Sequence, residues 1–180
     1  MVPESPLKPT EHGLVPESDG WFVLNAREAP WRPAEGRGAY CNFEGEPEFS
    51  QLGINLSILE PGATMAMYHW EADQEDFLVL AGEALLIIEG EERPLHQWDL
   101  VHCPAGTNHV IVGAGDAPCL VLAVGARDRS TGPEWGAYTV DEAAIRHGAG
   151  VTEATTKSEE AYARFPKRES SRYREGWLPD

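Results

Sequence analysis

The sequence predicts an all-β domain in which short antiparallel strands form a sandwich or a closed barrel. Three observations lead to this prediction. Short apolar or alternating stretches follow one another closely between residues 52 and 125, Gly and Pro turns separate them, and no helical pattern lies between them. Strands that alternate with helices would predict a parallel sheet, whereas short strands joined by tight turns are typical of antiparallel sandwiches and barrels.

Side chains of a strand point alternately to its two faces, so each strand can be assigned an inner and an outer face. We expect strands at residues 21–24, 52–59, 64–71, 75–81, 84–88, 93–95, 100–103, 109–112, 119–124 and 135–140. Strands 84–88 and 119–124 are apolar at almost every position, which predicts that both of their faces are buried. Either a partner subunit or the C-terminal helices of the same chain must then cover the outer faces.

The segments on either side of the regular strands differ from them in composition. Residues 1–20 hold repeated prolines among polar residues, which predicts an extended, mobile N-terminal arm. Residues 21–140 form the predicted barrel domain, and residues 141–180 the short helices and a C-terminal tail. The helices are expected at 141–148 and 158–165, capped by their first residues. Aromatic residues in the tail predict that it docks on another surface, and in a homodimer we expect the arm or the tail to cross to the partner.

The charge of the chain limits its partners. Thirty acidic residues against 14 basic ones give a formal net charge of −16. Such a surface repels phosphate backbones, so we expect no nucleic-acid partner. It should also discourage anionic substrates, unless a local arginine reverses the field.

The sequence also indicates a compartment. It has no apolar run of about 18 residues, and its first residues lack a basic region followed by an apolar one, so we expect neither a membrane span nor a secretory signal. Cys41, Cys103 and Cys119 are odd in number and form no C-x-x-C pair. We interpret them as reduced thiols in a cytoplasmic protein.

Two histidines and two carboxylates fall within or next to the expected strands. His69 and Glu71 project from one face of strand 64–71, Glu75 begins the next strand, and His109 begins a distant one. A closed barrel could bring all four together as ligands of one divalent metal ion. Nitrogen and oxygen donors suit Zn, Mn, Fe(II), Ni or Co, and two histidines with one carboxylate would satisfy the facial triad of non-haem iron enzymes.

Parity along the strands also predicts which side chains surround this site. Those that share a face with the four ligands should line a cavity, or else belong to plain core: Met65, Met67, Phe77, Val79 and Ile111. Tyr68 and Trp70 have the opposite parity and should point away from the cavity. We expect the other four histidines at the surface or in structural roles: His12, His96, His102 and His147.

These residues resemble the two motifs of the cupin superfamily. The first motif runs glycine, His-x-His, glutamate, glycine, and here it reads Gly62, His69-Trp70-Glu71, Glu75, Gly82. The second contains Pro-x-Gly and a histidine, matched by Pro104-Ala105-Gly106 and His109. The resemblance covers a core at residues 52–125 and is to small single-domain cupins of the conserved-barrel "cupin 2" type. It implies a jelly-roll β-barrel, often dimeric, with a metal inside.

The sequence departs from these motifs at three positions. Glu71 replaces the second histidine of the first motif, and Trp98 and Gly113 replace the glycine and the asparagine of the second. The ligand set is therefore two histidines and two glutamates at most. Alternatively, Glu71 is a general base beside the metal, which leaves His69, Glu75 and His109 as ligands.

The resemblance implies a metal-dependent enzyme that acts on a small organic molecule in the barrel cavity. Dioxygenase, isomerase and lyase activities are all possible, because cupins share a scaffold while their chemistry differs. The alternative is a non-catalytic module that binds a small molecule or a metal. We also expect a homodimer, because a lone small barrel should not need strands that are apolar on both faces.

Overall fold

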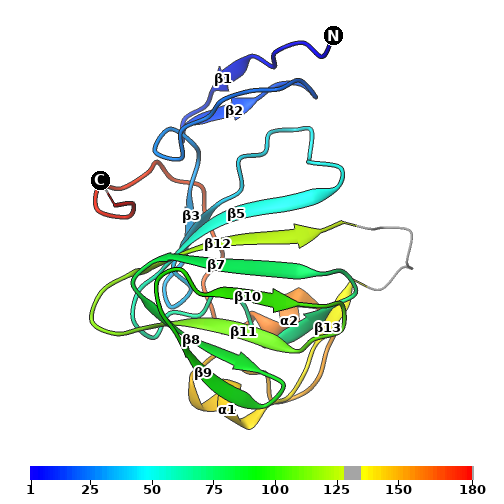
Figure 1. Cartoon of the computed structure of the whole chain (residues 1–180), viewed down its shortest axis with the longest axis vertical. Helices are drawn as coiled ribbons and strands as arrows, with labels where there is room; N and C mark the ends of the chain where they lie inside the picture. Colours follow the sequence, from blue (N-terminus) through cyan, green and yellow to red (C-terminus); the bar gives the residue numbers. More distant parts are fainter. Residues whose placement is uncertain (128–134, 180) are drawn as a thin grey trace.

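Two antiparallel sheets face one another and form the body of the protein (Figure 1). The computed structural model describes residues 1–127 and 135–179. One sheet has six strands in the order β10-β7-β12-β5-β4-β3. Their bounds are β3 Arg32–Pro33, β4 Ala39–Cys41, β5 Leu52–Leu59, β7 Glu75–Ala81, β10 Leu100–Cys103 and β12 Cys119–Ala126.

The second sheet has five strands in the order β13-β6-β11-β8-β9. Their bounds are β6 His69–Glu71, β8 Glu83–Ile88, β9 Glu91–Leu95, β11 His109–Ala114 and β13 Gly136–Tyr138. A separate hairpin of β1 (Leu7–Pro9) and β2 (Leu14–Pro16) lies within the N-terminal arm, whose mobility stays a prediction. The all-β class and the barrel architecture expected from the sequence are confirmed.

The core between the two sheets consists of the inward side chains of both. Phe77 and Val79 of β7 and Val121 of β12 pack with Leu86 of β8 and Ile111 of β11, and all five are buried. Since consecutive side chains alternate, the same strands present a second apolar face to the outside.

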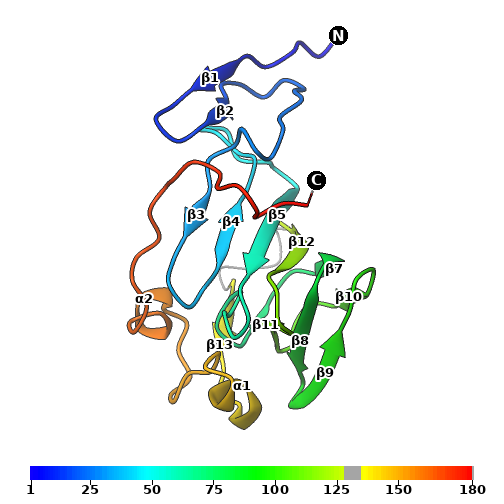
Figure 2. The same ribbon diagram turned by 90° about the vertical axis from the view of Figure 1, so that its left-hand side faces the viewer.

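The chain itself covers both outer faces that the sequence marks as apolar. Helix α1 (Glu142–Arg146) places Ala143 over Ile87 of β8. On the other sheet, Leu120 of β12 lies in one cluster with Trp31 and with aromatic residues of the C-terminal tail. Figure 2 shows this tail running from α2 (Ser158–Ala161) back past β3. The apolar faces that led us to expect a homodimer therefore have a covering within one chain.

The structure corrects two expected strands. Residues 21–24 form no strand, and only an isolated bridge joins Trp21 to Glu4. The strand expected at 64–71 is reduced to β6, because the backbone N–H groups of Met67 and Tyr68 donate to the Tyr162 hydroxyl and to the Ala149 carbonyl instead of to a neighbouring strand. Alternation before His69 is thereby lost.

The two helices are shorter than expected. The Asp141 side chain accepts a hydrogen bond from the Ala144 N–H, so the predicted cap of α1 is confirmed. For α2 the expected cap was wrong, since Lys157 occupies the N-cap position and Ser158 begins the helix. Among the described residues, no helix is long and apolar enough to cross a membrane.

The two non-ligand departures from the second motif have different consequences. Trp98 adopts φ +77° and is 67% exposed, so its side chain contributes little packing while its backbone is in the left-handed region. Gly113 lies near the end of β11, where an added Cβ would come 2.3 Å from the Glu60 carbonyl oxygen. Glycine is thus required at residue 113, whereas at residue 98 a tryptophan occupies a conformation that glycine prefers.

We therefore expect Trp98→Gly to stabilise the protein. Glycine removes the strain of the left-handed backbone conformation but also gives the unfolded chain more conformational entropy. We expect the first effect to be larger and to raise the free energy of unfolding by about 0.5–1 kcal/mol. Denaturant unfolding would measure it. Trp98→Ala is the matched control, because it removes the same indole but keeps a Cβ. Equal effects of the two substitutions would show that the indole, and not the backbone conformation, matters.

Candidate metal centre

The pairing of β6 with β11 places two histidines side by side. His109 is the register partner of His69, and their ring centroids are 5.0 Å apart. Both side chains are buried. Glu75 is the first residue of β7, in the opposite sheet, and follows β6 after a short turn. The site therefore draws on strands of both layers.

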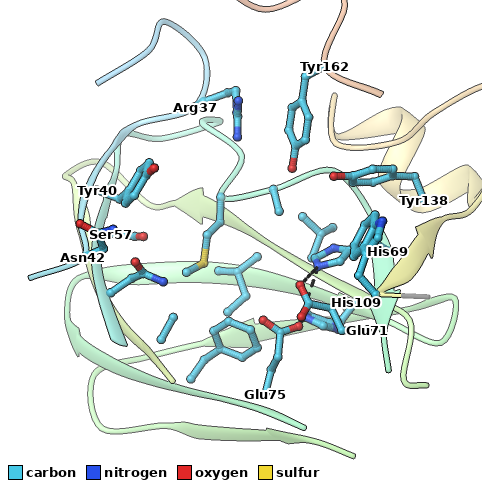
Figure 3. Close-up of a pocket in the computed structure, with 18 of the residues that line it drawn as sticks. Arg37, Tyr40, Asn42, Ser57, His69, Glu71, Glu75, His109, Tyr138 and Tyr162 are labelled. Carbon is cyan, nitrogen blue, oxygen red and sulfur yellow. Dashed lines mark ion pairs between the residues drawn. The ribbon is translucent and has the colours of Figure 1, made fainter. Parts of the chain in front are cut away.

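Three donor atoms converge at this place (Figure 3). Glu75 Oε2 lies 3.2 Å from His109 Nε2 and 3.8 Å from His69 Nε2. Among the described residues, His69, Glu75 and His109 are the group of histidine, cysteine and acidic side chains whose ligand atoms all lie within 4.8 Å of one another. Small movements would bring these atoms to the distances of about 2.0–2.2 Å at which nitrogen and oxygen bind a divalent ion.

The orientation of both imidazoles suits metal binding. His69 Nδ1 lies 2.8 Å from the Met67 carbonyl oxygen, and His109 Nδ1 lies 2.9 Å from that of Thr107. A carbonyl only accepts, so each Nδ1 donates and each Nε2 is left with its lone pair toward the cavity. His109 Nε2 and Glu75 Oε2 are buried and, although 3.2 Å apart, form no hydrogen bond of good geometry with one another or with another described residue. Buried polar atoms without partners are costly, and a bound cation would satisfy both.

The pKa of His109 reflects the groups that lie close to its imidazole. Burial lowers the pKa of this imidazole, but the neighbouring Cys103 and the Glu75 carboxylate outweigh burial and raise the pKa to about 10. A proton and a metal ion therefore compete for His109 Nε2.

Glu71, which the sequence proposes as ligand or base, lies at the edge of this group. Its Oε1 is 3.4 Å from His69 Nε2, and its side chain is 33% exposed, against 16% for Glu75. It does not belong to the set of mutually close ligand atoms. A half-exposed carboxylate beside the metal position can reach a bound molecule, so this geometry is compatible with the base role.

The site opens into a cavity of about 480 Å³, within the range of small-molecule sites. Of the residues expected to line it, Met65, Phe77 and Ile111 do so. The structure places the other two elsewhere. Met67 packs against Tyr138 because the strand is interrupted before His69, and Val79 lies farther along β7 in the core between the sheets.

The sequence itself matches a known family over the strands that build this site. Residues 55–125 match the family described as Cupin domain. This part of the chain is a cupin domain. No curated protein matches the sequence of the chain.

Solved structures with the same fold include several cupins of diverse description. A sugar phosphate isomerase of the cupin superfamily from Silicibacter pomeroyi is 24% identical, covers 68% of this chain and 88% of its own, and has a TM-score of 0.55. A predicted oxalate decarboxylase from Thermotoga maritima is 21% identical, covers 58% and 98%, and has a TM-score of 0.52. A polyketide cyclase from Streptomyces resistomycificus is 14% identical, covers 59% and 79%, and has a TM-score of 0.51. These likenesses show the fold.

Many cavity residues of this cupin lie outside the segments that the motifs cover. They come from β3–β5, from the region around β13 and from the C-terminal segment: Arg37, Tyr40, Asn42, Glu44, Ser57, Trp135, Tyr138, Tyr162 and Arg168. Most of them lie in loops or in very short strands, where periodicity gives no orientation. The one related signal in the sequence is the aromatic residues of the tail, which predict that the tail docks but do not identify the surface on which it docks.

The remaining histidines lie apart from the candidate metal group or have other partners, whereas one of the cysteines, Cys103, neighbours His109. His102 Nδ1 contacts Asp76 Oδ1 at 2.6 Å, and His147 Nε2 lies 3.3 Å from Glu92 Oε1. Both are at least partly exposed, in keeping with a surface role. The three cysteines are free and buried. Tyr68, expected to point away from the cavity, packs under α1 with Ile87.

Proposed function

We propose that this cupin binds one divalent metal ion through His69, Glu75 and His109 and acts as a metal-dependent enzyme on a small organic molecule in the cavity. The observation that carries the proposal is the convergence of three donor atoms, two of them buried without a hydrogen-bond partner among the described residues. Such atoms at the floor of a cavity are arranged to receive a cation.

The protein residues around that position have separable roles. When bound, a divalent ion would polarise a carbonyl or lower the pKa of a water molecule. The Met67 and Thr107 carbonyls hold the imidazoles in the orientation needed for binding. Phe77 and Ile111 provide an apolar floor that excludes water, and Glu71, at the edge, is placed to take or return a proton as general base.

The reaction class stays open among dioxygenase, isomerase and lyase types. Solved structures of this fold include a sugar phosphate isomerase, a polyketide cyclase and a predicted oxalate decarboxylase. That diversity supports enzymatic activity in general without selecting one reaction, since one fold serves many chemistries. The metal is Zn, Mn, Fe or Ni on the donor set alone.

Elemental analysis of protein purified without added metal tests the proposal. We expect close to one equivalent of a divalent metal, which His69→Ala and His109→Ala each remove. His102→Ala is the matched control, because this imidazole also contacts a carboxylate but lies outside the cavity. Unchanged metal content in both cavity variants would refute the site. Metal binding without turnover of any carbonyl or phenolic substrate would favour a non-catalytic binding module instead.

Glu71→Gln separates the two roles of Glu71. If Glu71 is the base, the variant should keep its metal and lose about 10²–10⁴-fold in turnover, the range that general acid–base catalysis contributes. Metal content and steady-state rates, measured on the same preparation, would check this. Loss of the metal would instead make Glu71 a fourth ligand.

The homodimer and the cytoplasmic location stay predictions. Light scattering at micromolar concentration would check the first, and a monomer would contradict it.

A further inference from the structure

Two arginines line the cavity together with the candidate metal group. Arg37 lies in the loop between β3 and β4, and Arg168 lies in the C-terminal segment after α2. Figure 3 shows the Arg37 guanidinium pointing into the cavity between Tyr40 and Tyr162, apart from the His69–Glu75–His109 group. The cavity thus has a carboxylate-lined end and a cationic end.

The charge of these arginines is not neutralised by any carboxylate that the structure describes. Arg127, a third arginine of the cavity, pairs with Glu44 through contacts of 2.7 and 3.1 Å. By contrast, no ion pair joins Arg37 or Arg168 to an acidic side chain within residues 1–127 and 135–179, and the Nε atoms of both are buried without a hydrogen-bond partner there. In a chain with a net charge of −16, two unpaired guanidinium groups in one cavity need an explanation.

The two arginines differ in what their remaining N–H groups do. Arg168 donates to the carbonyl oxygens of Arg32, Arg37 and Gly38 at 2.5, 2.7 and 3.2 Å, so it holds the β3–β4 loop. The Arg37 guanidinium stacks on the Tyr162 ring at 3.8 Å from the ring centroid. Stacking uses the face of the guanidinium and leaves its N–H edge for a ligand.

This arrangement is unfavourable without an anion. Burial lowers the pKa of Arg37, and burial followed by the nearby Arg37 charge lowers the pKa of Arg168 to about 10. Both lowered pKa values express the cost of burying a guanidinium charge, and that of Arg168 also reflects repulsion by the nearby Arg37 charge. At the other end, a divalent ion would balance the two carboxylates of Glu71 and Glu75. The arginines therefore leave a net positive charge for the ligand to balance.

We propose that Arg37 binds an oxyanion group, a carboxylate or a phosphate, of a small molecule whose other end reaches the metal position, and that Arg168 positions Arg37 through its backbone carbonyl. The substrate is then an organic anion with oxygen donors at the far end. That the far end of this molecule reaches the metal position rests on the proposed function. The anion site at Arg37 does not. A local arginine thus reverses, inside the cavity, the field that repels anions from the surface.

Ligand-observed NMR titrations at low ionic strength test the anion site. Chelator-treated protein is titrated with propionate, methyl phosphate and neutral propionamide. We expect at least one of the two anions to bind and the amide not to bind. Preference for propionate would indicate an organic acid, and preference for methyl phosphate a phosphate ester. Absence of binding by both anions would overturn the proposal.

Variants assign the binding to Arg37. Arg37→Met, which keeps an unbranched stem and removes the guanidinium, should weaken anion binding at least about tenfold, as expected for loss of a charged hydrogen bond. Arg32→Met is the matched control, since Arg32 likewise stacks on a tyrosine, Tyr40, but does not line the cavity. Equal weakening in both variants, or in neither, would overturn the assignment.

The same variants keep this proposal distinct from the metal site. His109→Ala should lose the metal and still bind the anion, whereas Arg37→Met should keep the metal and lose the anion. Anion binding in a protein that takes up no metal would refute the proposed function alone. Metal binding with unchanged anion affinity in Arg37→Met would refute the anion site alone.

Discussion

Replacing Glu75 with glutamine is expected to lower the affinity for a divalent metal by more than about 100-fold. Loss of a residue that merely orients a ligand costs about 10–100-fold, and Glu75 is placed to be a ligand itself. Its Oε2 lies within 4 Å of both histidine Nε2 atoms, 3.2 Å from that of His109 and 3.8 Å from that of His69. Glutamine keeps the size of the side chain and removes the anionic donor, so the change acts on the site and not on packing.

Thermal melts with and without added metal would measure this effect. A ligand that binds only the folded state stabilises it by about 2.7 kcal/mol at a hundredfold excess over Kd. The unmodified protein should show that gain and Glu75→Gln should lose most of it. Glu83→Gln, on the exposed start of β8, is the control and should respond to metal as the unmodified protein does. Full metal stabilisation of Glu75→Gln would exclude Glu75 as a ligand.

Replacing Trp31 with alanine is expected to lower the free energy of unfolding by about 3–5 kcal/mol. Trp31 is fully buried, and its Nε1 donates to the Ala26 carbonyl at 2.8 Å. Its ring lies 5.2 Å from Trp177 and 6.2 Å from Tyr173, so it is where the C-terminal tail docks on the six-stranded sheet. The substitution removes a large side chain from a cluster that joins residues 24–43 and the six-stranded sheet to the C-terminal tail.

Denaturant unfolding followed by fluorescence would measure the loss. Trp21→Ala is the control, because Trp21 is 53% exposed and its removal should change the free energy of unfolding by no more than about 0.5 kcal/mol. Limited proteolysis should also release the tail of Trp31→Ala earlier than that of the unmodified protein. Equal stability of the two variants would show that the tail does not depend on Trp31.

The sequence was sufficient for the part of the site that lies on regular strands. Alternation and motif spacing placed His69, Glu75 and His109 at one cavity, and the structure brings these three together. The same reasoning failed for Met67, because a hydroxyl from a distant segment accepts its N–H and interrupts the strand. The position of Arg37 in the cavity could not be predicted, because a loop between a two-residue and a three-residue strand has no periodicity that orients its side chains.

The outer faces of the barrel show a similar limit. The sequence indicated that β8 and β12 needed covering, yet composition could not decide between a second subunit and the chain's own ends. The covering comes from α1 and from the tail at Trp177, contacts that join segments far apart in the sequence. Such long-range packing depends on the complete fold, and no local pattern encodes it.

The histidines belong to the five-stranded layer and Glu75 to the six-stranded one. An ion held by all three would cross-link the two sheets at the edge where they meet. Its removal should therefore speed amide hydrogen exchange at the adjoining ends of β6, β7 and β11 together, while the far side of the barrel near β9 keeps its protection.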